Sequence, residues 1–105
     1  MVTTIRSAKI QSGKFIEAIQ WAVKVAMLIN RKLNSHTKVA RNVGGLFSEV
    51  HWLTEFENLA EYETFRDKLE ADGEYQAMFK EAISQDLFVA ESVMDQMYGV
   101  VPLPK

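Results

Sequence analysis

Two adjacent glycines, Gly44 and Gly45, stand between two runs in which apolar and polar residues alternate. Both central residues of a type I′ turn have positive φ angles, which glycine adopts without a clash at Cβ. Residues 37–58, TKVARNVGGLFSEVHWLTEFEN, therefore predict a β-hairpin followed directly by the start of a helix. With a two-residue turn, the cross-strand pairs are Val43 with Leu46, Arg41 with Ser48, Val39 with Val50, and Thr37 with Trp52.

Side chains alternate between the two faces of a strand, so this hairpin has two distinct faces. The more apolar face, which we assign to a helix-covered core, carries Thr37, Val39, Arg41, Val43, Leu46, Ser48, Val50, Trp52, Thr54 and Phe56. The mixed face, which we expect to meet water or a partly polar cavity, carries Lys38, Ala40, Asn42, Phe47, Glu49, His51, Leu53 and Glu55. A register shifted by one residue would exchange the faces, and Arg41, Ser48 and Trp52 would then take the place of His51.

Length and charge narrow the class of protein. The 105 residues suffice for one domain with one core, spanning residues 1–105. There are 14 acidic against 12 basic residues and no long run of either sign, which argues against nucleic-acid binding. The chain has no cysteine, so disulfides and thiolate sites are excluded.

The N-terminus lacks an apolar leader core, and no apolar stretch approaches the roughly 20 residues of a membrane span, so we expect a cytoplasmic protein without membrane contact.

The other elements follow from periodicity and capping residues. Residues 2–10 predict a strand and residues 13–33 a long helix, with Ser12 as N-cap and Asn34 as left-handed C-cap. Its predicted inward stripe is Phe15, Ile19, Ala22, Val23, Ala26, Ile29 and Leu33. Trp21, Val25 and Leu28 widen the apolar surface, so a second side of this helix is expected to meet either a neighbouring helix or another subunit.

Two shorter helices and a last strand complete the chain. Asn58 and Glu61 form a capping box for a helix that ends near Glu70, and Asp72 caps another helix over residues 74–85. Their predicted inward residues are Leu59, Tyr62, Phe65 or Arg66, and Leu69 in the first, and Tyr75, Met78, Phe79, Ala82 and Ile83 in the second. Residues 87–101 alternate and predict a fourth strand, with a helical continuation through Met97 as the alternative.

The order strand, helix, strand, strand, helix, strand is that of the split βαβ, ferredoxin-like α+β fold. In this fold the helices cover one face of a four-stranded antiparallel sheet, and the other face is open in a monomer. Apolar groups on that open face predict an interaction surface. A symmetric homodimer, packed sheet to sheet, is the simplest arrangement that would cover it.

The segment from His51 to Phe79, HWLTEFENLAEYETFRDKLEADGEYQAMF, resembles the NIPSNAP-like and antibiotic-monooxygenase-like branches of the dimeric α+β barrel superfamily. Those proteins start their second short helix with Asp-Pro-Glu-aromatic, where this chain has Asp72-Gly73-Glu74-Tyr75. The motif covers about a third of the chain, and element order covers the rest. The resemblance implies a homodimer whose two sheets enclose a barrel. It implies no particular reaction, because the superfamily includes oxygenases, haem degraders, isomerase-like enzymes and proteins without known chemistry.

His51 is the leading candidate for chemistry. On the mixed face it would lie near Glu49 and Lys38 and near a carboxylate of the last strand, Glu91 or Asp95, and a histidine beside a carboxylate can act as a general base. The alternative is a hydrogen-bonded strand histidine in a charge-balanced patch. The further pocket candidates are Arg41, Trp52 and Tyr98. Neither His36 nor Glu49-x-His51 supplies the three or more ligands of a zinc site, so we expect no metal and no cofactor.

Two functional hypotheses follow. One is a homodimeric protein that binds or oxidises a small organic molecule without a cofactor, in the barrel or in a pocket between helices and sheet. The other is a non-catalytic homodimeric binding or structural module. The sequence contains no motif that decides whether the protein is an enzyme or names its ligand.

Overall fold

The computed structural model describes residues 1–45 and 48–104. These residues form four strands, three α-helices and a short 3₁₀ turn. In chain order they are β1 (Val2–Lys9), α1 (Phe15–Leu33), β2 (Lys38–Arg41), β3 (Glu49–Phe56), α2 (Leu59–Glu70), α3 (Gly73–Ser84), η1 (Ala90–Ser92) and β4 (Met94–Gly99). This order confirms the predicted ferredoxin-like α+β fold, with the second helical region divided into α2 and α3.

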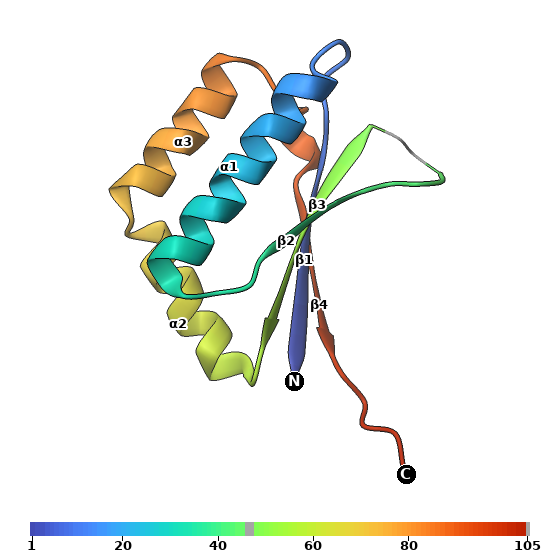
Figure 1. The fold of residues 1–105 in the computed structure, drawn as a ribbon, viewed down its shortest axis with the longest axis vertical. Coiled ribbons are helices and arrows are strands. Elements are labelled where there is room, and N and C mark those ends of the chain that lie inside the picture. Colours follow the sequence, from blue (N-terminus) through green and yellow to red (C-terminus); the bar gives the residue numbers. More distant parts are fainter. Residues whose placement is uncertain (46–47, 105) are drawn as a thin grey trace.

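The sheet is antiparallel throughout and has the strand order β2-β3-β1-β4. The helices form a layer against one of its faces, and no element of the described chain covers the other (Figure 1). Beyond β4 the C-terminal segment continues past the end of the sheet (Figure 1). The two-layer arrangement follows from the need of each amphipathic element to bury its apolar side.

The predicted hairpin exists, but its register was wrong by two residues. Val39 pairs with Trp52 and Arg41 with Val50, whereas a Gly44-Gly45 turn would pair Val39 with Val50. The strands end at Arg41 and begin again at Glu49, so they are separated by more than a two-residue turn; in the described part between them, Gly45 has a φ of 76° and Gly44 does not have a positive φ. The predicted partner Leu46 and the predicted open-face residue Phe47 lie outside the described residues.

Within β2 and β3 the assignment of the two sheet faces was nevertheless correct, because an offset of two residues preserves the alternation of a strand. The assignment of Val43 to the core face was wrong, because it lies beyond the end of β2 and is 95% exposed. Val50, Thr54 and Phe56 are buried on the helix side, and Trp52 packs against the same core. Lys38, His51 and Leu53 belong to the opposite face. Arg41, the charged exception on the core face, is exposed at the end of β2, which is an edge strand of the sheet.

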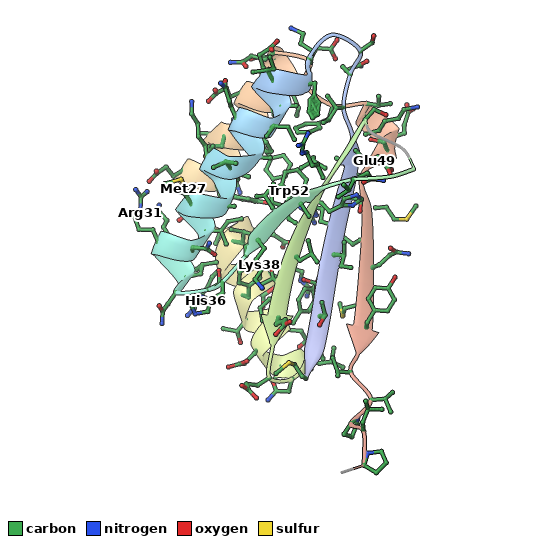
Figure 2. All side chains as sticks on the ribbon, turned by 45° about the vertical axis from the view of Figure 1, so that its right-hand side comes forward. Met27, Arg31, His36, Lys38, Glu49 and Trp52 are labelled. Carbon is green, nitrogen blue, oxygen red and sulfur yellow. The ribbon has the colours of Figure 1, made fainter. Side chains whose placement is uncertain are left out.

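The predicted inward stripe of α1 is confirmed except at Val23, and the buried surface is wider than that stripe. Trp21, Val25 and Leu28 are buried, whereas Val23 is 43% exposed. The second side of α1 is covered within the chain, because the Trp21 indole donates a hydrogen bond of 3.0 Å to the Met78 carbonyl of α3. This favours the neighbouring helix over another subunit as the cover of that side. Exposed apolar side chains remain on the outer face of α1, among them Met27 (Figure 2).

Most of the predicted helix ends are present. Asn34 has left-handed angles, and the side chains of Asn58 and Asp72 accept from the backbone N–H groups of Glu61 and Tyr75, each at 2.9 Å. The Ser12 cap was wrong. The helix begins two residues later, after Lys14, and has no side-chain cap. Two residues predicted to point inward are instead exposed, Leu59 at 57% and Ile83 at 76%.

The predicted last strand was too long. The strand begins at Met94, and the chain before it makes a single bridge from Phe88 to Ile10 and then the turn η1. The Ser92 hydroxyl donates to the Val89 carbonyl at 2.6 Å and accepts from the backbone N–H of Lys9 at 2.9 Å. The Ser92 side chain thus supplies the acceptor for the Lys9 N–H that a residue of β4 would otherwise provide, and it stabilises the turn that interrupts the ladder.

Candidate functional site

A cavity of about 610 Å³ lies between the helix layer and the sheet. Its walls are mostly apolar and aromatic, with contributions from all the α-helices described and from the helix-facing side of the sheet. The aromatic residues that line it are Trp21, Trp52, Tyr62, Phe65, Tyr75, Phe79 and Phe88. Lining residues that are themselves exposed, such as Val93 just before β4 and Met97 within it, place its mouth toward that strand. A concave site of this size suits a small organic molecule.

The aromatic walls are rigidly held. Trp21 meets Trp52, Phe79 and Phe88 edge to face, with ring centroids 5.4 to 6.1 Å apart. Trp52 lies between α1 and the sheet (Figure 2), and its indole N–H donates to the Ala22 carbonyl at 3.2 Å. Edge-to-face aromatic pairs stabilise beyond their buried area. Because both indole N–H groups bond to backbone carbonyls, the two tryptophans offer a ligand ring surface rather than hydrogen bonds.

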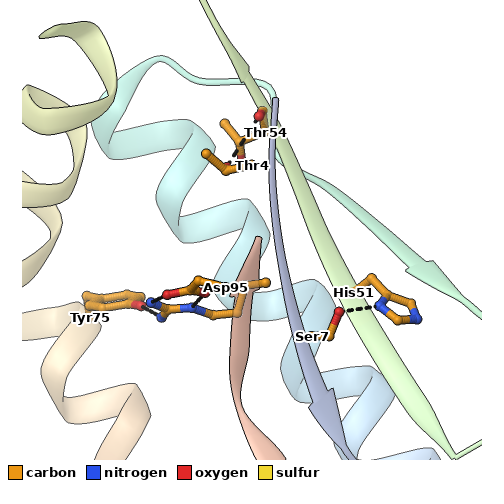
Figure 3. A network of polar contacts seen from close by, with 7 residues as sticks. Thr4, Ser7, His51, Thr54, Tyr75 and Asp95 are labelled. Atoms are coloured by element: carbon orange, nitrogen blue, oxygen red, sulfur yellow. Dashed lines mark hydrogen bonds and ion pairs between the residues drawn. The ribbon is translucent and has the colours of Figure 1, made fainter. Parts of the chain in front are cut away.

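Arg6, Asp95 and Tyr75 form the polar part of the cavity wall. The Arg6 guanidinium donates from Nε and Nη2 to the two carboxylate oxygens of Asp95, at 2.7 and 2.9 Å. A third bond of 3.4 Å runs from Arg6 Nη1 to the Tyr75 hydroxyl (Figure 3). The fold brings these groups together because Arg6 and Asp95 are directly paired between β1 and β4, while α3 carries Tyr75 above them.

The protonation states of this group follow from its contacts. The hydrogen bonds from Arg6 hold the pKa of Asp95 below its ordinary value, and the same pair raises the pKa of the guanidinium. Burial, which disfavours the phenolate, raises the pKa of Tyr75. At neutral pH the site therefore contains a carboxylate, a guanidinium and a protonated phenol.

His51 lies on the other side of the sheet. Its Nδ1 is 2.6 Å from the Ser7 hydroxyl, and its Nε2 is 2.5 Å from Oδ1 of Asn42. Figure 3 shows the Ser7–His51 pair and the Tyr75–Arg6–Asp95 group on opposite sides of the strands. His51 therefore does not line the cavity, and both of its ring nitrogens have protein partners other than the expected Glu49 and Lys38.

The other candidates are divided between the two faces. Trp52 lines the cavity, whereas Lys38, Glu49 and Tyr98 belong to the open face, and Arg41 is exposed on β2. Asp95 lies on the helix side and pairs with Arg6 rather than with His51. Sequence reasoning missed Tyr75 and Arg6 as site residues. The available signal was the position of Arg6 on the same strand parity as Val2 and Ala8, which places a charge on a core-facing row.

Two negative observations apply to the described residues. They contain no group of three or more histidine, aspartate or glutamate side chains arranged to hold a metal ion. Within the same part of the chain, every helix is too short or too polar to cross a lipid bilayer.

The fold and the cavity define a ferredoxin-like α+β protein with an apolar chamber between helix layer and sheet. The sequence matches the NIPSNAP family model over residues 3–97, and the chain belongs to this family. No protein with a curated description matches it.

Solved structures support the same fold. An uncharacterised NIPSNAP-like domain protein from Burkholderia xenovorans is 20% identical, with a TM-score of 0.79 and coverage of 98% of this chain and 90% of that one. A NIPSNAP family protein from Agrobacterium tumefaciens is 19% identical, with a TM-score of 0.76 and coverage of 97% and 92%. A candidate antibiotic biosynthesis monooxygenase from Deinococcus radiodurans is 10% identical, with a TM-score of 0.72 and coverage of 100% and 97%.

Proposed function

We propose that this protein binds a small organic molecule in the cavity between the helices and the sheet. The observation that carries the proposal is an aromatic-lined chamber of about 610 Å³ in a chain of only 105 residues. Protein interiors are normally packed to crystal-like density, and an unfilled apolar space of this size forfeits contacts that a ligand would restore.

The polar groups of the cavity favour binding over proton abstraction. A cofactor-independent oxidation starts with removal of a substrate proton, and Asp95 is a weak base because Arg6 lowers its pKa. Oxidation of the bound molecule is the second candidate function. Its support is the fold shared with candidate antibiotic biosynthesis monooxygenases from Deinococcus radiodurans and Nitrosomonas europaea. Oxygen uptake on addition of a ligand that binds would distinguish the two.

The binding proposal can be tested through the two tryptophans, since the chain has only Trp21 and Trp52 and both line the cavity. In an NMR titration with a small aromatic ligand, both indole N–H signals should shift in a saturable manner. The Ala82→Leu variant, which extends a side chain from α3 into the cavity, should weaken that binding. Indole signals that do not respond to any apolar ligand would contradict the proposal.

We further propose that the protein is a homodimer whose subunits pack through their open sheet faces. That face carries Ile5, Leu53, Met94 and Tyr98, and Met94 is 58% exposed in the single chain. Covering such a surface stabilises by about 25 cal/mol per Å² of apolar area. Two copies related by a two-fold axis would cover both faces at once. In this arrangement Lys38, Glu49 and His51 would contribute to the interface rather than to the cavity.

A further inference from the structure

Tyr75 has a hydroxyl proton without a protein acceptor among the described residues. The residue is only 9% exposed, and its hydroxyl oxygen accepts from Arg6 Nη1 at 3.4 Å. Its ring packs edge to face on Phe79, with centroids 4.9 Å apart, so the hydroxyl position is fixed. A buried donor normally has an acceptor. Because Tyr75 lines the cavity, a ligand oxygen or nitrogen there could accept this proton.

Several other donors in the wall are engaged, and of the remaining lining residues with donors Tyr62 is half-buried and Gln96 is exposed. The indole groups of Trp21 and Trp52 bond to backbone carbonyls, as described above. Thr4 donates to the Thr54 carbonyl at 3.3 Å, and Thr37 and Thr54 share a bond of 2.8 Å between their hydroxyls. The hydroxyls of Thr37 and Thr54 use one of their two protons in the bond between them. Tyr75 is therefore the donor that is buried, is rigidly held and has its oxygen already bonded to Arg6.

The charges of the wall do not attract an anion into the cavity. The charge of Arg6 is neutralised by the Asp95 carboxylate, to which Arg6 donates two hydrogen bonds. Of the remaining charged lining residues, Arg66 is exposed and so are the acidic Glu70 and Asp86. The lining thus has two positive against three negative side chains. An ionised ligand would lose hydration on entry without gaining an unpaired opposite charge deep in the site.

We propose that the ligand is an uncharged, predominantly apolar molecule with one hydrogen-bond acceptor, such as a ketone or ester oxygen, that receives the Tyr75 hydroxyl proton. This inference rests on the proposed binding function and specifies the ligand class for the same cavity. Arg6 is a positioning residue in this arrangement. Arg6 donates to the Tyr75 hydroxyl oxygen from one side, so the hydroxyl proton points away from Arg6. Asp95 neutralises the positive charge of Arg6.

The test uses four ligands with one ring system: a naphthyl methyl ketone, ethylnaphthalene, naphthoate and naphthylmethylamine. Dissociation constants come from the NMR titration of the two indole signals. The ketone should bind about three- to tenfold more tightly than ethylnaphthalene, the gain of one hydrogen bond. Naphthoate and the amine should bind more weakly than the ketone.

Two variants locate the selectivity. Tyr75→Phe removes the hydroxyl but keeps the ring, and it should abolish the ketone preference while leaving ethylnaphthalene binding unchanged. Asp95→Asn frees the Arg6 charge, and it should raise the affinity for naphthoate severalfold. Tyr98→Phe makes the same chemical change on the open face and is the matched control, in which the ketone preference should persist.

The binding results distinguish a wrong ligand class from the absence of a binding site. Tightest binding of naphthoate or of the amine by the unaltered protein would overturn the ligand class while upholding the cavity as a binding site. A ketone preference that survives Tyr75→Phe would assign the acceptor contact to another donor, such as the threonine pair, and would also overturn the inference. If none of the four ligands binds, the proposed binding function itself fails, and the ligand class with it.

Discussion

Arg6 and Asp95 are 89 positions apart in the sequence and form a two-bond ion pair across the β1–β4 ladder, with distances of 2.7 and 2.9 Å. The pair joins the edge strand β4 to the inner strand β1 and contributes to the cavity wall. The two side chains are 41% and 55% exposed, so solvent screens their interaction.

The first prediction concerns the pH dependence of stability. Asp95→Asn should lower the free energy of unfolding by about 1 kcal/mol at neutral pH, the upper range for a partly exposed pair. Because the folded-state pKa of Asp95 is lowered, its contribution is present above the unfolded-state pKa of about 3.9 and is lost as pH falls through the folded value. The difference between the two proteins in urea unfolding should therefore be constant from about pH 8 to 5 and shrink below about pH 4. A difference that grows on acidification would contradict this account.

The second prediction tests whether the cavity is unfilled. Ala82 and Ala18 are both buried helical alanines, but Ala82 lines the cavity and Ala18 does not. Ala18→Leu should destabilise the protein by about 1–3 kcal/mol, the usual effect of overpacking a dense core. Ala82→Leu should change stability by less than about 1 kcal/mol, because the added carbons enter open space. Thermal and urea unfolding of both variants measure the difference, and equal destabilisation would argue for a packed interior at Ala82.

The third prediction concerns the start of α2. Asn58 accepts from the backbone N–H of Glu61 at 2.9 Å, and the Glu61 carboxylate accepts from the backbone N–H of Glu57 at 2.7 Å. Asn58→Ala should lower the free energy of unfolding by about 1 kcal/mol, since one helix donor loses its partner. Asn58→Ser retains a capping oxygen and should remain within about 0.5 kcal/mol of the parent. Similar losses in both variants would mean that the cap is not the source of the effect.

The fourth prediction concerns assembly. Sedimentation should give a mass near twice the 12.0 kDa of one chain. Met94→Glu places a charge on the open sheet face and should shift the equilibrium toward monomer. Met27→Glu is the matched control, since Met27 is 66% exposed on the outer face of α1 and should leave the dimer intact. A monomer at micromolar concentration, or dissociation by Met27→Glu alone, would be inconsistent with a sheet-to-sheet dimer.

Local features of the sequence determined much of the architecture. The element order, the alternation along β1 and β3, and the caps at Asn34, Asn58 and Asp72 all depend on residues close together in the chain. The face of the sheet to which each strand residue points was predicted correctly for a physical reason. A period of two leaves the faces unchanged when the register shifts by two residues, so Val50 and Trp52 were assigned to the correct face with the wrong partners.

Tertiary structure alone decided the register of β2 on β3, the turn before β4 and the composition of the site. The register depends on a loop whose length the paired glycines did not specify, and the late start of β4 depends on a Ser92 bond to a distant strand. His51 was a reasonable candidate from its neighbours in sequence, but its contacts are Ser7 and Asn42. Arg6, Tyr75 and Asp95 come from three separate elements, and only the packing of α3 over the β1–β4 edge brings them to one wall. Cavities and such groups result from how elements pack, which no periodicity within a single element encodes.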